Sequence, residues 1–178
     1  QLKNFYGGLL RGDLGTSNRY RTGAPIAEII VQKAPISIQM GLMSMGVALL
    51  LGIPMGAKMA RSKSKLWDKM GTAFIVFINA VPAAVYYIYL QSFGSRALNI
   101  SMLFDPRNVL SWVLPVLSMS LGSIAYYAMW LRRYMVDEMN KDYVQLARAK
   151  GVKGQDITMG HVFRNAFVPM IQYIPGSI

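Results

Sequence analysis

The sequence contains no cysteine, a single histidine (His161) and only eight acidic residues among its 178 residues. Without cysteine it can form no disulfide and offers no thiolate to a metal, and one histidine argues against a metal site or a histidine-based nucleophilic site. No acidic residue falls inside the long apolar runs. Neither a P-loop pattern nor H-E-x-x-H occurs. We therefore expect no catalytic residue, no metal ligand and no ATP-binding loop in this chain.

Three long runs of the sequence carry no charged residue: 34–57, 70–95 and 108–131. Each run, of about 24 to 26 residues, exceeds the ~20 residues that a helix needs to cross a bilayer core. The sequence therefore predicts an all-α fold, a polytopic bundle of membrane helices. Residues 165–178 are also apolar but too short to span, and we interpret them as the start of a truncated membrane helix.

The net charge of +11 comes from basic residues that lie between these runs. This distribution favours membrane orientation over nucleic-acid binding as the explanation of the charge. By the positive-inside rule the basic links 58–69 and 132–164 are cytoplasmic, and the link 96–107 is external. Alternation also places 1–33 outside, although that stretch is itself basic, and requires an earlier helix. We expect the chain to be an internal piece of a protein with at least five spans.

The predicted spans contain uncharged polar residues. Ser120, Ser123 and Tyr127 stand at i, i+3 and i+7, so they share one helical face. A face of hydroxyls without carboxylates suits a path for polar solutes better than a proton relay or a cation site. The candidate translocation residues are Asn79, Gln91, Ser120, Ser123 and Tyr127. The alternative is that such side chains bond back to their own helices.

Prolines and glycines also mark the predicted spans. Pro35, Pro54, Pro82 and Pro115 each remove an amide donor and tend to kink a helix. Gly52 and Gly56 form a G-x-x-x-G pair, which permits close contact between two membrane helices. These features indicate a packed bundle rather than isolated anchors.

The stretch "DYVQLARAKGVKG", residues 142–154, predicts a short cytoplasmic helix. Asp142 is a candidate N-cap, and Gly151 suits the left-handed position that ends a helix. The side chains expected to share a face are Tyr143, Leu146, Ala147 and Lys150. A helix of about two turns is marginal alone, so it needs support from its own bundle or from another protein.

A second amphipathic helix is predicted next, with Asp156 as a possible cap. Its apolar face is expected to contain Met159, Val162, Phe163, Ala166 and Phe167. Because it leads directly into the next apolar segment, the pair could transmit motion from the cytoplasm to a membrane helix. The alternative is a plain structured loop.

The run "YVQLARAKGVKGQDITMGHVFRNAFVPM" resembles the EAA loop of ABC importer permeases, in the form found in oligopeptide, dipeptide and nickel transporters. "GDLGTS", residues 12–17, resembles the external segment of the permease subunit that is usually encoded first. Two positions depart from the general loop pattern: its glutamate is absent before "ARA", where Leu146 or a neighbour stands, and His161 matches its isoleucine. Any role that rests on the missing carboxylate is therefore in doubt.

This resemblance implies a multi-pass permease subunit in a prokaryotic cell membrane, importing oligopeptides or dipeptides. It implies four kinds of partner: a second homologous permease, two cytoplasmic ATPases that hold ATP and Mg, an external solute-binding protein and the lipid bilayer. The residues implied to dock on an ATPase are Asp142, Tyr143, Leu146, Ala147, Arg148, Ala149 and Gly151. Those implied to link this helix to the next span are Arg164, Asn165 and Pro169.

Three alternatives stay open at this point. The same type of permease could import nickel or another small solute. A secondary transporter or channel would work without ATP, and would call for ion-binding residues at mid-membrane, which the three runs lack. A scaffold subunit without transport activity would use the 142–164 region only as a binding platform.

Overall fold

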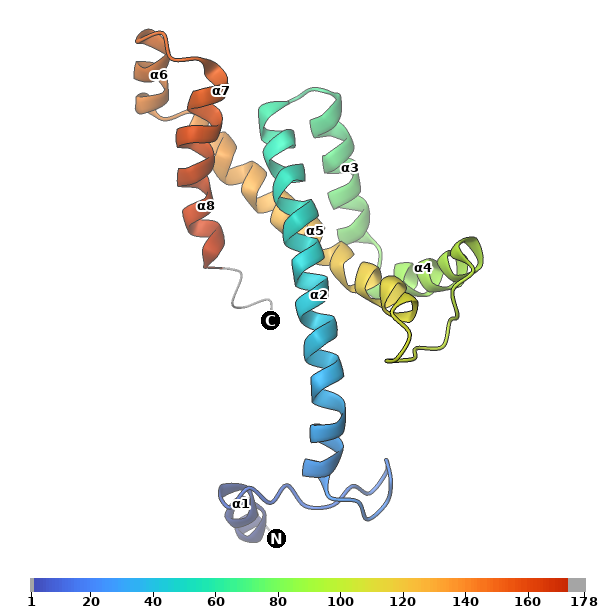
Figure 1. The fold of residues 1–178 in the computed structure, drawn as a ribbon. Coiled ribbons are helices and arrows are strands. Elements are labelled where there is room, and N and C mark those ends of the chain that lie inside the picture. Colours follow the sequence, from blue (N-terminus) through green and yellow to red (C-terminus); the bar gives the residue numbers. More distant parts are fainter. Residues whose placement is uncertain (1, 173–178) are drawn as a thin grey trace. The chain divides into compact units, whose positions relative to one another are not determined.

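A computed structural model describes residues 2–172, and within them the fold is built from helices alone (Figure 1). An isolated bridge between Thr16 and Pro25 is the one pairing of strand type in this part of the chain. The all-α prediction is thereby confirmed. The elements are α1 (Leu2–Leu10), α2 (Ile26–Arg61), α3 (Leu66–Ala80), α4 (Ala83–Leu98), α5 (Leu110–Met139), α6 (Asp142–Ala149), α7 (Gly154–Asp156), the π-helix η1 (Ile157–Val162) and α8 (Phe163–Ile171).

Residues up to Met40 form one compact unit and those from Gly41 onward form another. In the first unit, the "GDLGTS" stretch turns between α1 and α2. Gly12 and Gly15 adopt positive φ angles of 79° and 75°, which glycine tolerates at no steric cost. The Asp13 carboxylate accepts a 2.9 Å bond from the Gly15 amide. The motif is therefore a turn whose backbone conformation favours glycine at both positions.

In the second unit, α2 packs against α5 through a row of small residues at a spacing of four. Ser44, Ala48, Gly52, Gly56 and Ala60 are all buried. A Cβ on Gly56 would lie 2.7 Å from the Ala128 carbonyl oxygen of α5, and one on Gly52 would lie 3.0 Å from that of Ile124. The predicted G-x-x-x-G contact is thus confirmed, because only glycine allows the two backbones this close.

The run 70–95 differs from the single helix predicted for it. It holds most of α3 and most of α4, which meet at a bend of 107°. Val81 and Pro82 between them are extended, with ψ of 128° and 134°. Proline lacks an amide hydrogen and disfavours the helical conformation in the residue before it, which agrees with the end of α3 at this point. By contrast, helices continue through the other three span prolines, Pro35 and Pro54 in α2 and Pro115 in α5.

Length and composition identify the helices that could cross a membrane. Within residues 2–172, α2 and α5 are long and apolar enough, and α3 with α4 would make a third span if the bent pair is one. The apolar runs 34–57 and 108–131 fall on α2 and α5. Residues 165–178 were predicted to begin a last span. The first part of this stretch lies in α8, and 173–178 lie outside the described residues.

The α2–α5 contact generates a test of the fold. Gly56→Ala is expected to destabilise the protein by about 1–3 kcal/mol, because the new methyl group meets backbone atoms of α5. Gly46→Ala, in the same helix and with no atom within 4 Å of its Cβ position, is the matched control and should be neutral or stabilising. Thermal unfolding in detergent measures both. Equal midpoints for the two variants would show that the close contact is not needed.

Candidate functional site

The short helix α6 begins and ends as its sequence allows, with one correction. Its N-cap is Lys141, whose side chain makes no cap bond, and the predicted cap Asp142 is instead the first helical residue. The second predicted cap, Asp156, is likewise inside a helix, whose N-cap is Lys153. Both carboxylates therefore act near the helix N-terminus through the dipole rather than through a cap bond.

Gly151 ends α6 as predicted. Its φ of 76° is left-handed, a conformation that costs glycine nothing. The Gly151 amide donates to the Arg148 carbonyl at 3.0 Å, and the Val152 amide donates to the Ala147 carbonyl at 3.1 Å. This pair of bonds is a Schellman motif, which satisfies two carbonyls that the helix would leave open. The chain can therefore reverse direction sharply after two helical turns.

The two faces of α6 differ in burial. Val144 is only 1% exposed and belongs to a cluster formed with α2, α5, η1 and α8, and Tyr143 and Ala147 pack against that cluster. Leu146 is 57% exposed. The predicted common face is therefore divided, since Tyr143 and Ala147 turn toward the bundle while Leu146 and Lys150 turn away from it. Arg148, Ala149 and Gly151 are also exposed.

After α6, the elements α7, η1 and α8 follow one another without a break from residue 154 to residue 171 (Figure 1). The buried side chains in this stretch are Ile157, Val162, Ala166 and Met170. Their spacing is five, then four, then four, and the step of five is the π-helix, whose bonds run from i to i+5. The prediction of Met159 on the apolar face was wrong: it is 43% exposed, because the wider turn shifts the phase and puts Ile157 in the core.

Polar contacts join α6 to the helices on either side of it. The Tyr143 hydroxyl donates to Glu138 of α5 at 3.0 Å and accepts from the Asn165 amide of α8 at 3.4 Å. Partial burial raises the pKa of the Tyr143 hydroxyl, so it remains a donor at neutral pH. Glu138 also accepts a bond from Lys141. Tyr143 and Asn165 were among the predicted residues, whereas Glu138 was missed because no local pattern marks it.

A second polar contact, also missed, joins α3 to α5. Asp68 in the first turn of α3 is 4% exposed, and its two carboxylate oxygens accept bonds from Nε and from an NH₂ group of Arg132, the latter at 2.8 Å. The Ser64 amide donates to the same carboxylate at 2.8 Å. A buried carboxylate needs this pairing to remain charged. The 62–65 turn is thereby tied to the end of α5 that leads to α6.

The structure places the predicted translocation residues in different surroundings. Ser120 and Tyr127 have no exposed surface. The prediction that they line a path for polar solutes is therefore corrected: both side chains pack inside the chain. The Ser120 hydroxyl donates to the Leu117 carbonyl of its own helix at 2.9 Å, as in the alternative interpretation. Asn79 is exposed, but its amide bonds to the Ile75 carbonyl. Ser123 and Gln91 are half-buried.

The remaining predicted residues lie on α8. Arg164 is exposed and Pro169 is half-buried inside the helix. Among the described residues there is no group of three or more histidine, cysteine, aspartate or glutamate side chains that could hold a metal ion. The arrangement around α6 is a short helix with a buried anchor, polar contacts to α5 and α8, and an exposed outer face.

Comparison with known proteins gives a consistent result. Residues 48–178 match the family described as binding-protein-dependent transport system inner membrane component. The chain is 36% identical over 140 residues to the oligopeptide transport system permease protein AmiC of Streptococcus pneumoniae, covering 78% of this chain and 28% of that protein.

Two further relatives match more of the chain. It is 28% identical over 170 residues to the dipeptide transport system permease protein DppB of Lactococcus lactis, covering 96% of this chain and 56% of the relative. It is 30% identical over 184 residues to the oligopeptide transport system permease protein AppB of Bacillus subtilis, with 96% and 57% covered. The chain thus spans between about a quarter and just over half of these relatives.

The buried anchor of α6 can be tested directly. Val144→Ala is expected to weaken the attachment of α6 by about 1–2 kcal/mol, because it removes buried methyl groups from the cluster. Leu146→Ala removes an exposed aliphatic side chain from the same helix and serves as the matched control. Hydrogen exchange of the α6 amides should accelerate in the first variant and stay unchanged in the second. Equal exchange in both would mean that Val144 does not anchor the helix.

The contribution of the Asp68–Arg132 pair to stability can be tested by comparing substitutions at Arg132 and at its sequence neighbour Arg133. Arg132→Gln should destabilise the protein by about 3 kcal/mol, the low end for breaking a buried pair, because Arg132 keeps 31% of its side chain exposed. Arg133→Gln removes the same charge from the next, exposed position and should change stability little. Thermal unfolding of both variants measures the difference, and a loss as large for Arg133 would attribute the effect to net charge alone.

Proposed function

This chain belongs to the family of binding-protein-dependent transport system inner membrane components, and on that premise we propose that it is a permease subunit of an ATP-driven importer of oligopeptides or dipeptides. It is a multi-pass membrane protein of an ABC transporter complex. The proposed solute class follows the names of the relatives, which are oligopeptide and dipeptide permeases. Half of the translocation pathway would come from this chain.

The observation that supports the coupling role is that α6 has one buried face and one exposed face. One face is held in the bundle by Val144, and the other exposes Leu146. An exposed leucine beside arginine and lysine on a helix of two turns is a suitable contact for a groove on a soluble protein. In this proposal the groove belongs to a cytoplasmic ATPase, and the docking residues are the outward ones, Leu146, Arg148, Ala149 and Gly151, with Asp142 at the start of the helix.

The inward residues would transmit the movement. A displacement of α6 by an ATPase acts on α5 and α8 through the Val144 cluster and through the Glu138–Tyr143–Asn165 contacts. Because α8 continues from this site through Arg164, Asn165 and Pro169, a shift of α6 reorients a helix that leads toward the membrane. This relay would be the physical link between ATP binding and opening of the pathway.

The remaining components follow from the family. The proposed partners are a second homologous permease, two ATPase subunits that hold ATP and Mg, and an external solute-binding protein. The ATP-dependent step would take place on the ATPase subunits, since no P-loop pattern occurs in these 178 residues. Asn79, Gln91 and Ser123 stay candidates for contact with the solute, because each keeps some exposed surface.

The docking proposal is tested by cross-linking. A single cysteine at Leu146, whose side chain points outward, should cross-link to an ATPase subunit through a short bifunctional reagent, in a manner that changes with ATP. Ala147→Cys, on the inward side of the same helix, should give several-fold less product. The 178 residues have no cysteine of their own, so no background arises from them.

A second control is Leu103→Cys, which is 82% exposed in the link predicted to lie outside the cell. It should react with a soluble thiol reagent but give no cross-link to an ATPase. If the Leu146 cysteine is accessible and yet cross-links to no ATPase in any nucleotide state, the docking role of α6 is wrong.

A further inference from the structure

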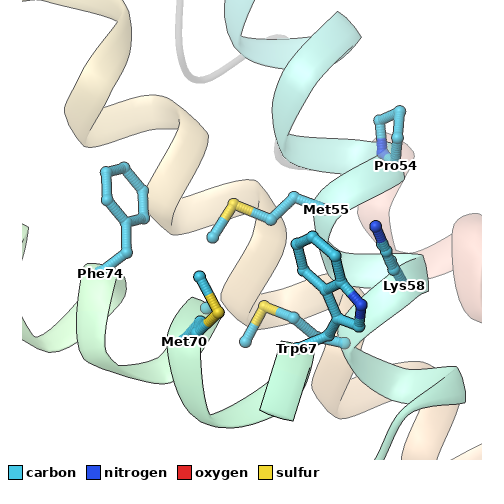
Figure 2. A pocket seen from close by; sticks show the side chains of 8 residues that line it. Pro54, Met55, Lys58, Trp67, Met70 and Phe74 are labelled. Carbon is cyan, nitrogen blue, oxygen red and sulfur yellow. The ribbon is translucent and has the colours of Figure 1, made fainter.

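A pocket of about 440 Å³ opens between α2 and α3, next to the short turn that joins them (Figure 2). Its volume lies within the range of about 300–1,000 Å³ that is usual for small-molecule sites. Three methionines, Met55, Met59 and Met70, and the rings of Trp67 and Phe74 supply most of its wall. The pocket is therefore strongly apolar, and methionine gives it a lining that adapts to a flexible guest.

One end of the pocket is cationic. Lys58 lines it beside Trp67, with the Lys58 ammonium 3.2 Å from the centre of the indole ring (Figure 2). This is a cation–π contact, and it places the charge at the exposed rim, since both residues are exposed while Met59 at the floor is 2% exposed. A guest that fits must combine a negatively charged group with an apolar chain.

The charge around the pocket is almost entirely positive. The 58–69 stretch contains five basic residues: Lys58, Arg61, Lys63, Lys65 and Lys69. Its one acidic residue, Asp68, is buried and paired with Arg132, so it does not offset the field at the rim. A basic cluster beside membrane helices attracts anionic lipid, at about 1 kcal/mol for each lysine or arginine near the surface.

The position of the pocket agrees with this chemistry. It lies where α2 ends and α3 begins; α2 is long and apolar enough to cross a membrane, and α3 is so together with α4. Tryptophan is enriched at the boundary between lipid tails and water, and lysine near a helix end extends its ammonium group to that boundary. A protein segment would need a fixed shape and a matching acidic group, whereas a phospholipid supplies both the negative headgroup and a flexible apolar chain.

We propose that this pocket binds one anionic glycerophospholipid, with an acyl chain among the methionines and the phosphate beside Lys58. The site is separate from the outer face of α6 and does not depend on the nature of the transported solute. Because Asp68 and the 62–65 turn join this corner to α5, the bound lipid would brace the end of α5 from which α6 extends.

The experiment uses the natural full-length protein in nanodiscs of phosphatidylcholine that contain a fixed fraction of phosphatidylglycerol. Bromine on the acyl chains of one lipid at a time quenches nearby tryptophan emission, and the difference from a Trp67→Phe variant isolates Trp67. Brominated phosphatidylglycerol should quench Trp67 several-fold more than brominated phosphatidylcholine at the same fraction.

Two variants decide whether Lys58 carries the preference. Lys58→Gln should reduce the preference for phosphatidylglycerol about fivefold, the ratio expected for one lysine near an anionic surface. Lys65→Gln removes the same charge from the neighbouring 62–65 turn, outside the pocket lining, and should reduce the preference much less. Both side chains are exposed, so neither change is expected to disturb folding, and size-exclusion profiles verify this.

Two results would overturn the proposal. Equal quenching by both brominated lipids would show that any acyl chain fills the pocket and that Lys58 selects none. Quenching of Trp67 by neither lipid would show that protein covers the pocket, from another part of the full-length chain or from a neighbouring subunit.

Discussion

The close contact of α2 with α5 is the constraint on which the second unit of this protein depends. Gly52 and Gly56 bring the backbone of α2 against Ile124 and Ala128, nearer than any side chain would allow. The same helix α5 supports the other elements: α3, α4, η1 and α8 all contact it. Because apolar burial gives helices little reason to associate inside lipid, this contact rests on close packing, where a single methyl group matters.

Much of this fold could be predicted from the sequence, because the signals involved are local. Runs without charge indicated the apolar stretches that α2 and α5 contain, and Gly151 indicated the end of α6 through its φ angle. The break at Pro82 differed from the single helix predicted for 70–95, since four span prolines look alike in sequence and helices continue through three of them. The π-helix could not be read from a period of 3.6, and so Met159 was placed on the wrong face.

The candidate site was predictable only in part, for a related reason. Tyr143 and Asn165 stand in the run that resembles the EAA loop, so the sequence identified them. Glu138 and Asp68 are important only through the side chains that the fold brings to them. Arg132, the partner of Asp68, is 64 positions away in the sequence. The predicted solute path through Ser120 and Tyr127 of α5 shows the opposite error, because a pattern visible in the sequence was given a function that the fold does not support. Ser118 and Ser120 both donate to carbonyls of their own helix, so these two serines do not by themselves mark a polar path.

The arrangement around α6 has a mechanical consequence. An apolar contact such as that of Val144 resists separation but allows sliding, because dispersion forces have little preferred direction. A hydrogen bond is directional, and the Tyr143 hydroxyl makes two, one to α5 and one to α8. Arg132 and Glu138, six residues apart on α5, hold α3 and α6 respectively. A force on the exposed face of α6 would therefore turn α5 and α8 together, with α3 following, instead of being lost in a flexible loop.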